Sequence, residues 1–284
     1  MHGFGFTCPP GGYYCLVLNK YLERPLTCLN CLGWLGVTTG FNNLKKTIEL
    51  GKKADAITVD CKFMQEFYHA YNPSLLPLPM ETDILKPSEK KDNYILYMGR
   101  LSFEKNPYGF LEIVKQVKHP CKMILYEIHQ DIVGLKSNYI ELLSTKLPNL
   151  EIILNPTKEE MIELIKHAKF VVLPYLFAEP FGVAAANTVM CGTPLITFPF
   201  GNSRNMTHLL PNTLSEMIEL INMTEHQYYT ELSKTLEKGN ELRHIHNPVN
   251  AIKIWDVFYK QLYSNDMTKS ITHIHKECKF QRGL

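Results

Sequence analysis

The sequence predicts an α/β fold, a doubly wound parallel sheet preceded by a smaller domain. From residue 93 onward, short apolar segments alternate regularly with segments of helical length. Two of these apolar segments, residues 170–174 and 194–198, are rich in Val, Ile and Leu, as expected of parallel strands covered on both faces. Strands that alternate with helices in this way indicate a parallel sheet, and such sheets bind ligands at the carboxyl ends of their strands.

The segments before residue 93 are shorter and less regular. Residues 1–40 are rich in Gly, Pro, Cys and aromatic residues, without clear periodicity. The pattern then predicts a basic helix, a strand, an amphipathic helix and a short strand, at residues 44–54, 55–60, 62–71 and 75–78. Residues 80–92 are polar and charged, so we expect a domain boundary there.

The larger domain is expected to alternate strand and helix from its first residues. Strands are predicted at residues 94–99, 122–127, 151–154, 170–174 and 194–198. Helices are predicted at residues 107–117, 139–147, 158–167, from about 182, 214–220, 225–238 and 251–262. The helix at 158–167 follows Thr157, and Glu160 completes a capping box with it.

Composition excludes several classes of protein. Hydrophobic residues make up 45% and charged residues 20% of the 284 residues, which are ordinary globular values. The net charge of +2, from 30 basic and 28 acidic residues, argues against nucleic-acid binding. No apolar stretch approaches the roughly 20 residues of a membrane span, and the first residues lack a signal-peptide pattern. We therefore expect a cytoplasmic protein.

The cysteines allow two interpretations. Cys28 and Cys31 have the spacing of metal ligands, and a zinc site would need two more ligands from Cys8, Cys15 or His2. Because only one such pair is present, we expect no metal. The scattered thiols are expected to be buried small hydrophobic residues, and these are Cys61, Cys121, Cys191 and Cys278.

The segment between the two apolar runs carries the most specific signal. Glu179 precedes Pro180-Phe181-Gly182, where a helix is expected to start. Free backbone N–H groups at a helix start favour an anionic ligand, whereas a carboxylate beside them suits sugar hydroxyls. This combination predicts a ligand with both groups, such as a nucleotide sugar. In the alternative interpretation, Glu179 only stabilises the helix dipole.

A second loop, Gly99 to Pro107, follows the first strand of the larger domain. Gly99 permits a tight turn, and Arg100 and Lys105 add two positive charges just beyond the strand. Arginine offers phosphate a bidentate fork and lysine a compact charge. Alone this pattern is typical of a solvated basic loop, but together with the Glu179 loop it favours phosphate binding.

These motifs resemble a known family. YMGRLSFEKNP, TKEEMIELIKHAKFVVLPY and AEPFGVAAANTVMCGTPLI together look like the donor domain of retaining glycosyltransferases of family 4, which have the GT-B fold. The segment ADAITVDCKFMQEFYHAYNPSLLPLPMETDILKP is similar to the end of that family's first domain and its linker, and HGFGFTCPPGGYYC to an earlier loop. The resemblance implies a complete C-terminal Rossmann-like domain and a partial N-terminal one.

The resemblance also implies roles for individual residues. Arg100 and Lys105 match the basic pair that holds the donor diphosphate, and Glu179 matches the acid near the transferred sugar. His2 matches the active-site histidine of the first domain. In the family, the backbone amides of one short segment contact the donor. The matching residues here are Phe181, Gly182 and Val183. The family needs no metal, because cationic side chains and helix-end amides stabilise the leaving nucleoside diphosphate.

Two features depart from the family pattern. The second acid of the Glu-x7-Glu motif is Asn187 here, which loses the charge-assisted hydrogen bond to the ribose. Asn187 could instead face solvent or cap a neighbouring group. The first domain is also short, which would leave sheet edges unpaired and His2 at a fraying terminus.

The sequence therefore favours an enzyme. We expect a metal-independent, retaining, hexosyltransferase-type glycosyltransferase without a cofactor, which uses a UDP-, GDP- or ADP-linked sugar and a glycan, lipid or small-molecule acceptor. The expected division is an acceptor-side domain at 1–87, a donor-binding domain at 88–262 and a tail at 263–284. The alternative is an inactive or truncated nucleotide-sugar-binding module, or a subunit that needs a partner chain.

Overall fold

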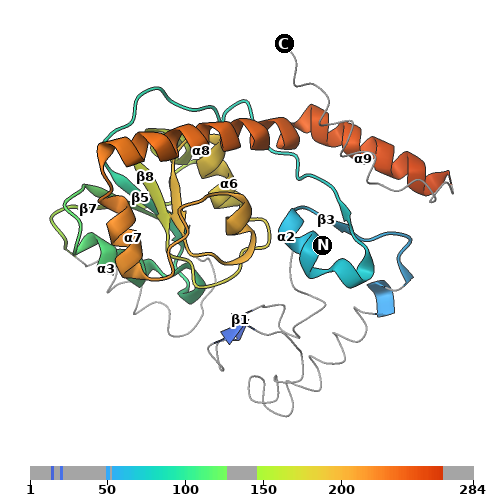
Figure 1. Cartoon of the computed structure of the whole chain (residues 1–284), viewed down its shortest axis with the longest axis horizontal. Helices are drawn as coiled ribbons and strands as arrows, with labels where there is room; N and C mark the ends of the chain where they lie inside the picture. The colour runs from blue at the N-terminus through green and yellow to red at the C-terminus, as the bar shows by residue number, and fades with distance from the viewer. Residues whose placement is uncertain (1–13, 16–19, 22–48, 52, 127–145, 265–284) are drawn as a thin grey trace. The chain divides into compact units, whose positions relative to one another are not determined.

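The computed structural model describes residues 14–15, 20–21, 49–51, 53–126 and 146–264 (Figure 1). The chain divides into two units, the first made of Met1–Met80 with Ile245–Leu284 and the second of Glu81–His244. The first boundary lies seven residues before the expected end of the acceptor-side domain at 87, and the last helix belongs to the first unit. The functional division of the sequence into 1–87 and 88–262 stays a prediction.

A five-stranded parallel sheet forms the centre of the second unit (Figure 1). Its strand order is β7-β6-β5-β8-β9, which corresponds to order 3-2-1-4-5 along the chain of this unit. The strands are β5 (Ile95–Arg100), β6 (Cys121–Tyr126), β7 (Leu150–Leu154), β8 (Phe170–Leu173) and β9 (Leu195–Thr197). All five were expected, within two residues at each end, and the α/β fold class is confirmed.

Ile95 fixes the register at the centre of this sheet. It pairs with Cys121 of β6 on one side and with Phe170 of β8 on the other. All four residues of β8 are buried, as are the first four of β5. Strands covered on both faces need continuous apolar runs, and this is the pattern that identified them in the sequence.

Helices cover both faces of the sheet. The crossover from β5 to β6 runs in the opposite direction along the sheet to those from β7 to β8 and from β8 to β9, so right-handed connections place their helices on opposite faces. Accordingly α3 lies beside α7, and α5 beside α6. These helices are α3 (Pro107–Val114), α5 (Lys158–His167), α6 (Val183–Met190) and α7 (Leu214–Ile221).

Local sequence fixes where these helices begin. Thr157 and Glu160 form the expected reciprocal capping box at the start of α5. Asn106 adopts a left-handed conformation (φ 51°), and its side chain accepts a hydrogen bond from the Gly109 N–H to cap α3. Gly182 (φ 82°) precedes α6, in a conformation that glycine adopts readily.

The long helix α8 (Glu225–His246) continues past its expected end at 238. It includes Gly239, a residue that usually weakens a helix. A Cβ at Gly239 would lie 3.2 Å from the carbonyl carbon of Val189 and still closer to its oxygen. Glycine therefore permits α8 to approach the backbone of α6, and this packing compensates for the low helix propensity.

In the described part of the first unit, β3 (Thr58–Val59) and β4 (Ser74–Leu75) form a short parallel pair. They are connected by α2 (Lys62–Phe67) and the 3-10 helix η2 (His69–Tyr71). The antiparallel pair β1 (Tyr14–Cys15) and β2 (Lys20–Tyr21) precedes them. Both expected strands of this region are present but shorter than predicted.

Helix α9 (Pro248–Tyr263) is hydrogen-bonded to the segment after β4 through the side chain of Trp255. The indole Nε1 of Trp255 donates a hydrogen bond of 2.9 Å to the carbonyl oxygen of Pro77. The next carbonyl oxygen of the same segment, that of Leu78, lies 2.8 Å from Nδ1 of the buried His246 at the end of α8. The sequence before and after the second unit therefore meets in one structural unit.

Three of the scattered cysteines, Cys61, Cys121 and Cys191, are buried and free, as expected. Burial raises the pKa of each thiol to about 12, so these side chains behave as small hydrophobic groups. Cys278 and the expected helix at 139–147 lie outside the described residues, apart from the last two positions of that segment.

Candidate active site

The two loops singled out in the sequence follow adjacent strands. β5 leads into the loop that contains Lys105, and β8 leads into the loop that contains Glu179. Because the strands are parallel, both loops lie at the carboxyl edge of the sheet. β5 and β8 also flank the point where the strand order reverses, which is where open α/β sheets bind ligands.

Lys105 and Glu179 form an ion pair between the two loops, although they are 74 residues apart in the sequence. Their side chains are only 12% and 23% exposed, so the pair is largely shielded from solvent. Lys105 belongs to the 3-10 helix η3 (Phe103–Lys105) that turns back after β5. The contact brings one cation and one carboxylate to a single place at the edge of the sheet.

Aromatic rings enclose the Lys105 ammonium group. Its Nζ lies 4.0 Å from the centre of the Tyr175 ring and 5.3 Å from that of Phe177. The Tyr97 hydroxyl donates a hydrogen bond of 3.1 Å to the backbone carbonyl of Lys105. Tyr97 and Tyr175 are both buried, so Tyr175 faces the cation and Tyr97 holds the backbone of Lys105 from within the core.

The pKa of Lys105 is unusual. Burial lowers it from 10.5 to about 8, the positive charge of Arg100 acts in the same direction, and Glu104 acts in the opposite direction. The contact with the Glu179 carboxylate also favours the charged ammonium. Lys105 is thus mostly protonated at neutral pH, but it loses its charge more easily than an exposed lysine.

Arg100 ends β5 and is 62% exposed. Its Nη2 lies 3.6 Å from Oε1 of Glu104, a residue that the sequence interpretation did not single out. The structure thus connects Lys105, rather than Arg100, to Glu179. Arg100 acts on Lys105 through its positive charge, which adds to the effect of burial in lowering the pKa of Lys105.

Helix α6 begins directly beside the Glu179 loop. Phe181 is buried, Gly182 is the N-cap, and Val183 is the first helical residue. The first N–H groups of a helix lack partners within it, so this end provides donors for an anion. Asn187 lies one turn further and is 8% exposed. Its expected ribose contact stays a prediction.

Gly99 is tightly surrounded near the end of β5. A Cβ at this position would lie 2.7 Å from the Tyr97 hydroxyl and 3.3 Å from Cβ of Lys105. A side chain at this position would force Tyr97 or Lys105 to shift, so glycine permits η3 to fold back against the strand and place Lys105.

Other predicted site residues lie outside the described structure. They are His2, Cys8, Cys28 and Cys31, and the side chain of Cys15 is also outside it. Within the described residues, no group of three or more His, Cys, Asp or Glu side chains is placed to hold a metal ion. The possible zinc site at the cysteines is therefore not tested.

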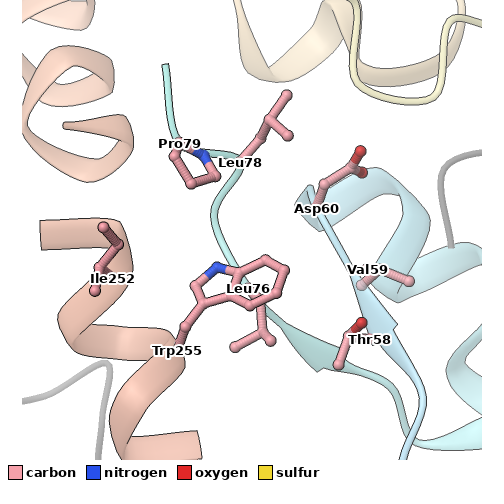
Figure 2. A pocket seen from close by; sticks show the side chains of 8 residues that line it. All are labelled: Thr58, Val59, Asp60, Leu76, Leu78, Pro79, Ile252 and Trp255. Atoms are coloured by element: carbon pink, nitrogen blue, oxygen red, sulfur yellow. The ribbon is translucent and has the colours of Figure 1, made fainter. Parts of the chain in front are cut away.

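The first unit contains a hollow of about 250 Å³ (Figure 2). Figure 2 shows Ile252 and Trp255 of α9 on one side and the Thr58–Asp60 segment on the other. Among the described residues that line it, Asp60 is the charged one and none is a lysine or arginine. This hollow therefore lacks the cations that a diphosphate requires, in contrast to the loops around Lys105.

Residues 81–208 match the family model for glycosyl transferases group 1. The matched range contains both loops and helix α6, so the candidate site lies within the segment that is similar to this family. A search of curated proteins found no match. Within the described part of the chain, none of the helices has the length and apolar character needed to cross a membrane.

Solved glycosyltransferase structures have a similar fold. Sucrose-phosphate synthase from Thermosynechococcus elongatus matches with a TM-score of 0.63 and 14% identity, over 79% of this chain and 62% of that one. Anabaena HepE in complex with UDP and glucose has a TM-score of 0.61 and 14% identity, over 77% of this chain and 67% of that one. A Rickettsia africae glycosyltransferase has a TM-score of 0.56 and 13% identity, over 74% of this chain and 64% of that one.

These similarities establish the GT-B fold for this chain. Identity of 12–14% in these and a further HepE structure supports the fold alone. The chain spans 62% of the length of the first of these structures. The expected fold is confirmed, whereas assignment to family 4 is not decided by these findings.

Proposed function

We propose that the chain transfers a sugar, with retention, from a nucleoside-diphosphate sugar to an acceptor hydroxyl on a glycan, lipid or small molecule. The observation that carries this proposal is the contact between Lys105 and Glu179 beside the start of α6. A diphosphate needs cations and N–H donors, and a sugar needs a hydrogen-bond acceptor. All three are present at the carboxyl edge of one sheet.

Each group has a distinct task in this proposal. Lys105, Arg100 and the N–H groups at the start of α6 bind the donor diphosphate. When the bond between the sugar and the diphosphate breaks, negative charge grows on the leaving phosphate, and fixed positive charges stabilise it. Glu179 accepts hydrogen bonds from hydroxyls of the transferred sugar. We assign the chemistry to these groups without a metal, as in glycosyltransferase family 4.

The ion pair suggests how the donor is accommodated. Without a donor, the negative charge of Glu179 balances the positive charge of Lys105 in the ion pair. An arriving diphosphate offers Lys105 a more highly charged partner and repels the carboxylate. The pair then separates, so that Lys105 turns to phosphate and Glu179 to the sugar. The residues that bind the two halves of the donor thus stabilise each other in its absence.

The remaining assignments complete the proposal. We propose residues 88–262 as the donor-binding domain and 1–87 as the acceptor-side domain, with His2 near the reacting sugar and Asn187 near the ribose. The base of the nucleotide could be uracil, guanine or adenine. The three similar HepE structures contain UDP or UDP-glucose, which makes UDP the first nucleotide to test.

The test begins with thermal unfolding of the purified chain in the presence of UDP, GDP or ADP. We expect one of them to raise the unfolding temperature, because a ligand that binds only the folded state stabilises it. The corresponding nucleotide sugar is then incubated with the chain, and release of nucleoside diphosphate is measured. We expect slow hydrolysis that Glu179→Ala abolishes.

A surface variant on α5, Glu159→Ala, serves as the matched control and should retain both properties. Stabilisation by a nucleotide without any turnover would support a binding module instead of an enzyme. Absence of stabilisation by all three nucleotides would contradict the proposed function.

A further inference from the structure

The loop that carries Glu179 is held from one side by the 3-10 helix η4 (Gly201–Asn205), which follows β9. The backbone N–H of Asn202 donates a hydrogen bond of 3.0 Å to the carbonyl oxygen of Glu179. The side-chain Nδ2 of Asn202 donates another, of 2.9 Å, to the carbonyl oxygen of Phe181. One residue therefore holds the two carbonyl groups on either side of Pro180.

Asn202 is itself fixed in place. It is 2% exposed, and its Oδ1 accepts a hydrogen bond of 2.9 Å from Nδ2 of Asn205. A buried amide destabilises a protein unless its polar atoms are hydrogen-bonded, so both partners restrict this side chain to one orientation. The amide thus acts as a rigid support for the Glu179 loop.

The neighbouring glycine permits this close approach. Gly201 has φ 61°, and a Cβ there would lie 2.7 Å from the backbone nitrogen of Glu179 and closer to its oxygen. Contacts below 3.0 Å are not tolerated without a shift, so any larger residue would displace the loop. The fit between η4 and the Glu179 loop is therefore specific.

We propose that Asn202 is a positioning residue, which holds the Glu179 carboxylate in place for the sugar part of the donor. This inference rests on the proposed function. Asn202 contacts the carbonyl groups of the loop, whereas the carboxylate of Glu179 lies against Lys105. Loss of the Asn202 side chain should therefore affect recognition of the sugar most. Diphosphate binding should change less, because its two cationic side chains, Arg100 and Lys105, lie on the other loop.

The experiment compares two ligands that differ only in the sugar. Calorimetry measures the Kd of the full chain for UDP and for UDP-glucose, or for the corresponding pair if GDP or ADP gives the larger thermal stabilisation. For Asn202→Ala we expect the nucleotide sugar to bind about tenfold more weakly, the effect of one lost hydrogen bond. The Kd for the nucleoside diphosphate should rise much less, because Arg100 and Lys105 still hold the phosphates even if the start of α6 shifts slightly.

Asn149→Ala is the matched control. The Nδ2 of Asn149 also holds backbone carbonyls, those of Val114 and Val117 at 3.1 and 3.0 Å, but it precedes β7 and so lies at the opposite edge of the sheet. We expect this variant to lose stability without a change in either Kd. If the role of Asn202 were merely structural, Asn202→Ala would behave like Asn149→Ala and lose stability without a change in either Kd.

Two further variants keep the proposal testable if Asn202→Ala does not fold. Asn202→Asp keeps the shape and the backbone N–H but lacks the donor to Phe181, and Gly201→Ala displaces the loop directly. Both should weaken nucleotide-sugar binding selectively. Equal losses for both ligands, or no loss for either, would overturn the assignment of Asn202. A wild-type chain that binds no nucleoside diphosphate would instead contradict the proposed function itself.

Discussion

At Lys105, burial and ion pairing act on one ammonium group in opposite directions. The rings of Tyr175 and Phe177 replace water around Nζ, and this loss of solvation disfavours the charged ammonium. The Glu179 carboxylate stabilises the charged form and so offsets part of that loss. A lysine with a lowered pKa responds to pH in a range where an exposed lysine does not. This makes its role in phosphate binding accessible to a simple titration.

Nucleoside diphosphate binding should weaken as the pH rises through about 8, the pKa of Lys105. Below this pH the free protein already carries the ammonium charge. Above it, binding must take up a proton, so the Kd rises by up to about tenfold per pH unit. In Lys105→Arg the charge persists, because arginine stays protonated, and the Kd should be flat in calorimetry from about pH 7 to about 9.5.

Lys115, an exposed lysine that caps the C-terminal end of α3, provides the control for this titration, because its ion pair with Glu112 lies on the surface. Lys115→Arg should reproduce the wild-type profile. Parallel profiles for wild type and Lys105→Arg would show that Lys105 does not contact the phosphate.

Arg100 is the second residue with a measurable role. Its exposed guanidinium lies near Glu104 and can turn to a diphosphate without disturbing the core. We expect Arg100→Ala to weaken nucleoside diphosphate binding by at least about 1.5 kcal/mol, the value of a charge-assisted hydrogen bond. An unchanged Kd in calorimetry would remove Arg100 from the site, and Lys115→Ala is the charge-matched control.

At the scale of elements, the ends of strands and helices determine where the site forms. Three connections define it: the turn from β5 into η3, the loop from β8 into α6, and the return of η4 after β9. Each requires a glycine, namely Gly99, Gly182 and Gly201, for close approach or for a left-handed conformation. Helix α5, which follows the outermost strand β7, is not part of these connections, and we expect it to contribute to stability instead.

Helix α5 allows that separation to be tested. Thr157→Ala removes the side chain that caps α5, and should lower the free energy of unfolding by about 1 kcal/mol. Chemical denaturation measures this change. Thr230→Ala, in the interior of α8 and exposed, removes the same atoms without removing a cap and should have little effect. Nucleoside diphosphate binding should be the same in both variants, and a loss in Thr157→Ala would connect α5 to the site.

At the scale of the whole molecule, the candidate site is confined to one edge of one sheet. The contacts that define it all lie in the second unit, between the ends of β5, β8 and β9. A ligand bound there should order the loops at that edge and leave distant elements unaffected. Amide hydrogen exchange reports such local ordering residue by residue.

We expect a nucleoside diphosphate to slow amide exchange in residues 100–106 and 174–184. Exchange in α5 (158–167) and α9 (248–263) should be unchanged, because α5 follows the outermost strand β7, two strands from β5, and α9 belongs to the other unit. The comparison uses the full chain with and without the nucleotide that stabilises it most. Protection of α9 without protection of the two loops would place the binding site elsewhere.

Much of the fold could be predicted from the sequence because it depends on local patterns. The apolar runs of β5 and β8, the capping box at Thr157 and the glycine at 182 each specify structure within a few residues. The two loops could also be recognised, because a basic loop and a carboxylate beside a helix start are short motifs. The short strands β3 and β4 were less predictable, since their pairing depends on distant neighbours.

The sequence by itself determined the α/β class, the five strands of the second unit and the two loops that carry Arg100, Lys105 and Glu179. Only the tertiary structure decided that Lys105, rather than Arg100, contacts Glu179, and that Tyr175 and Asn202 support this pair. The reason is physical: secondary structure follows from neighbours along the chain, whereas burial, a shifted pKa and a contact across 74 residues arise only when the strands are assembled into a sheet.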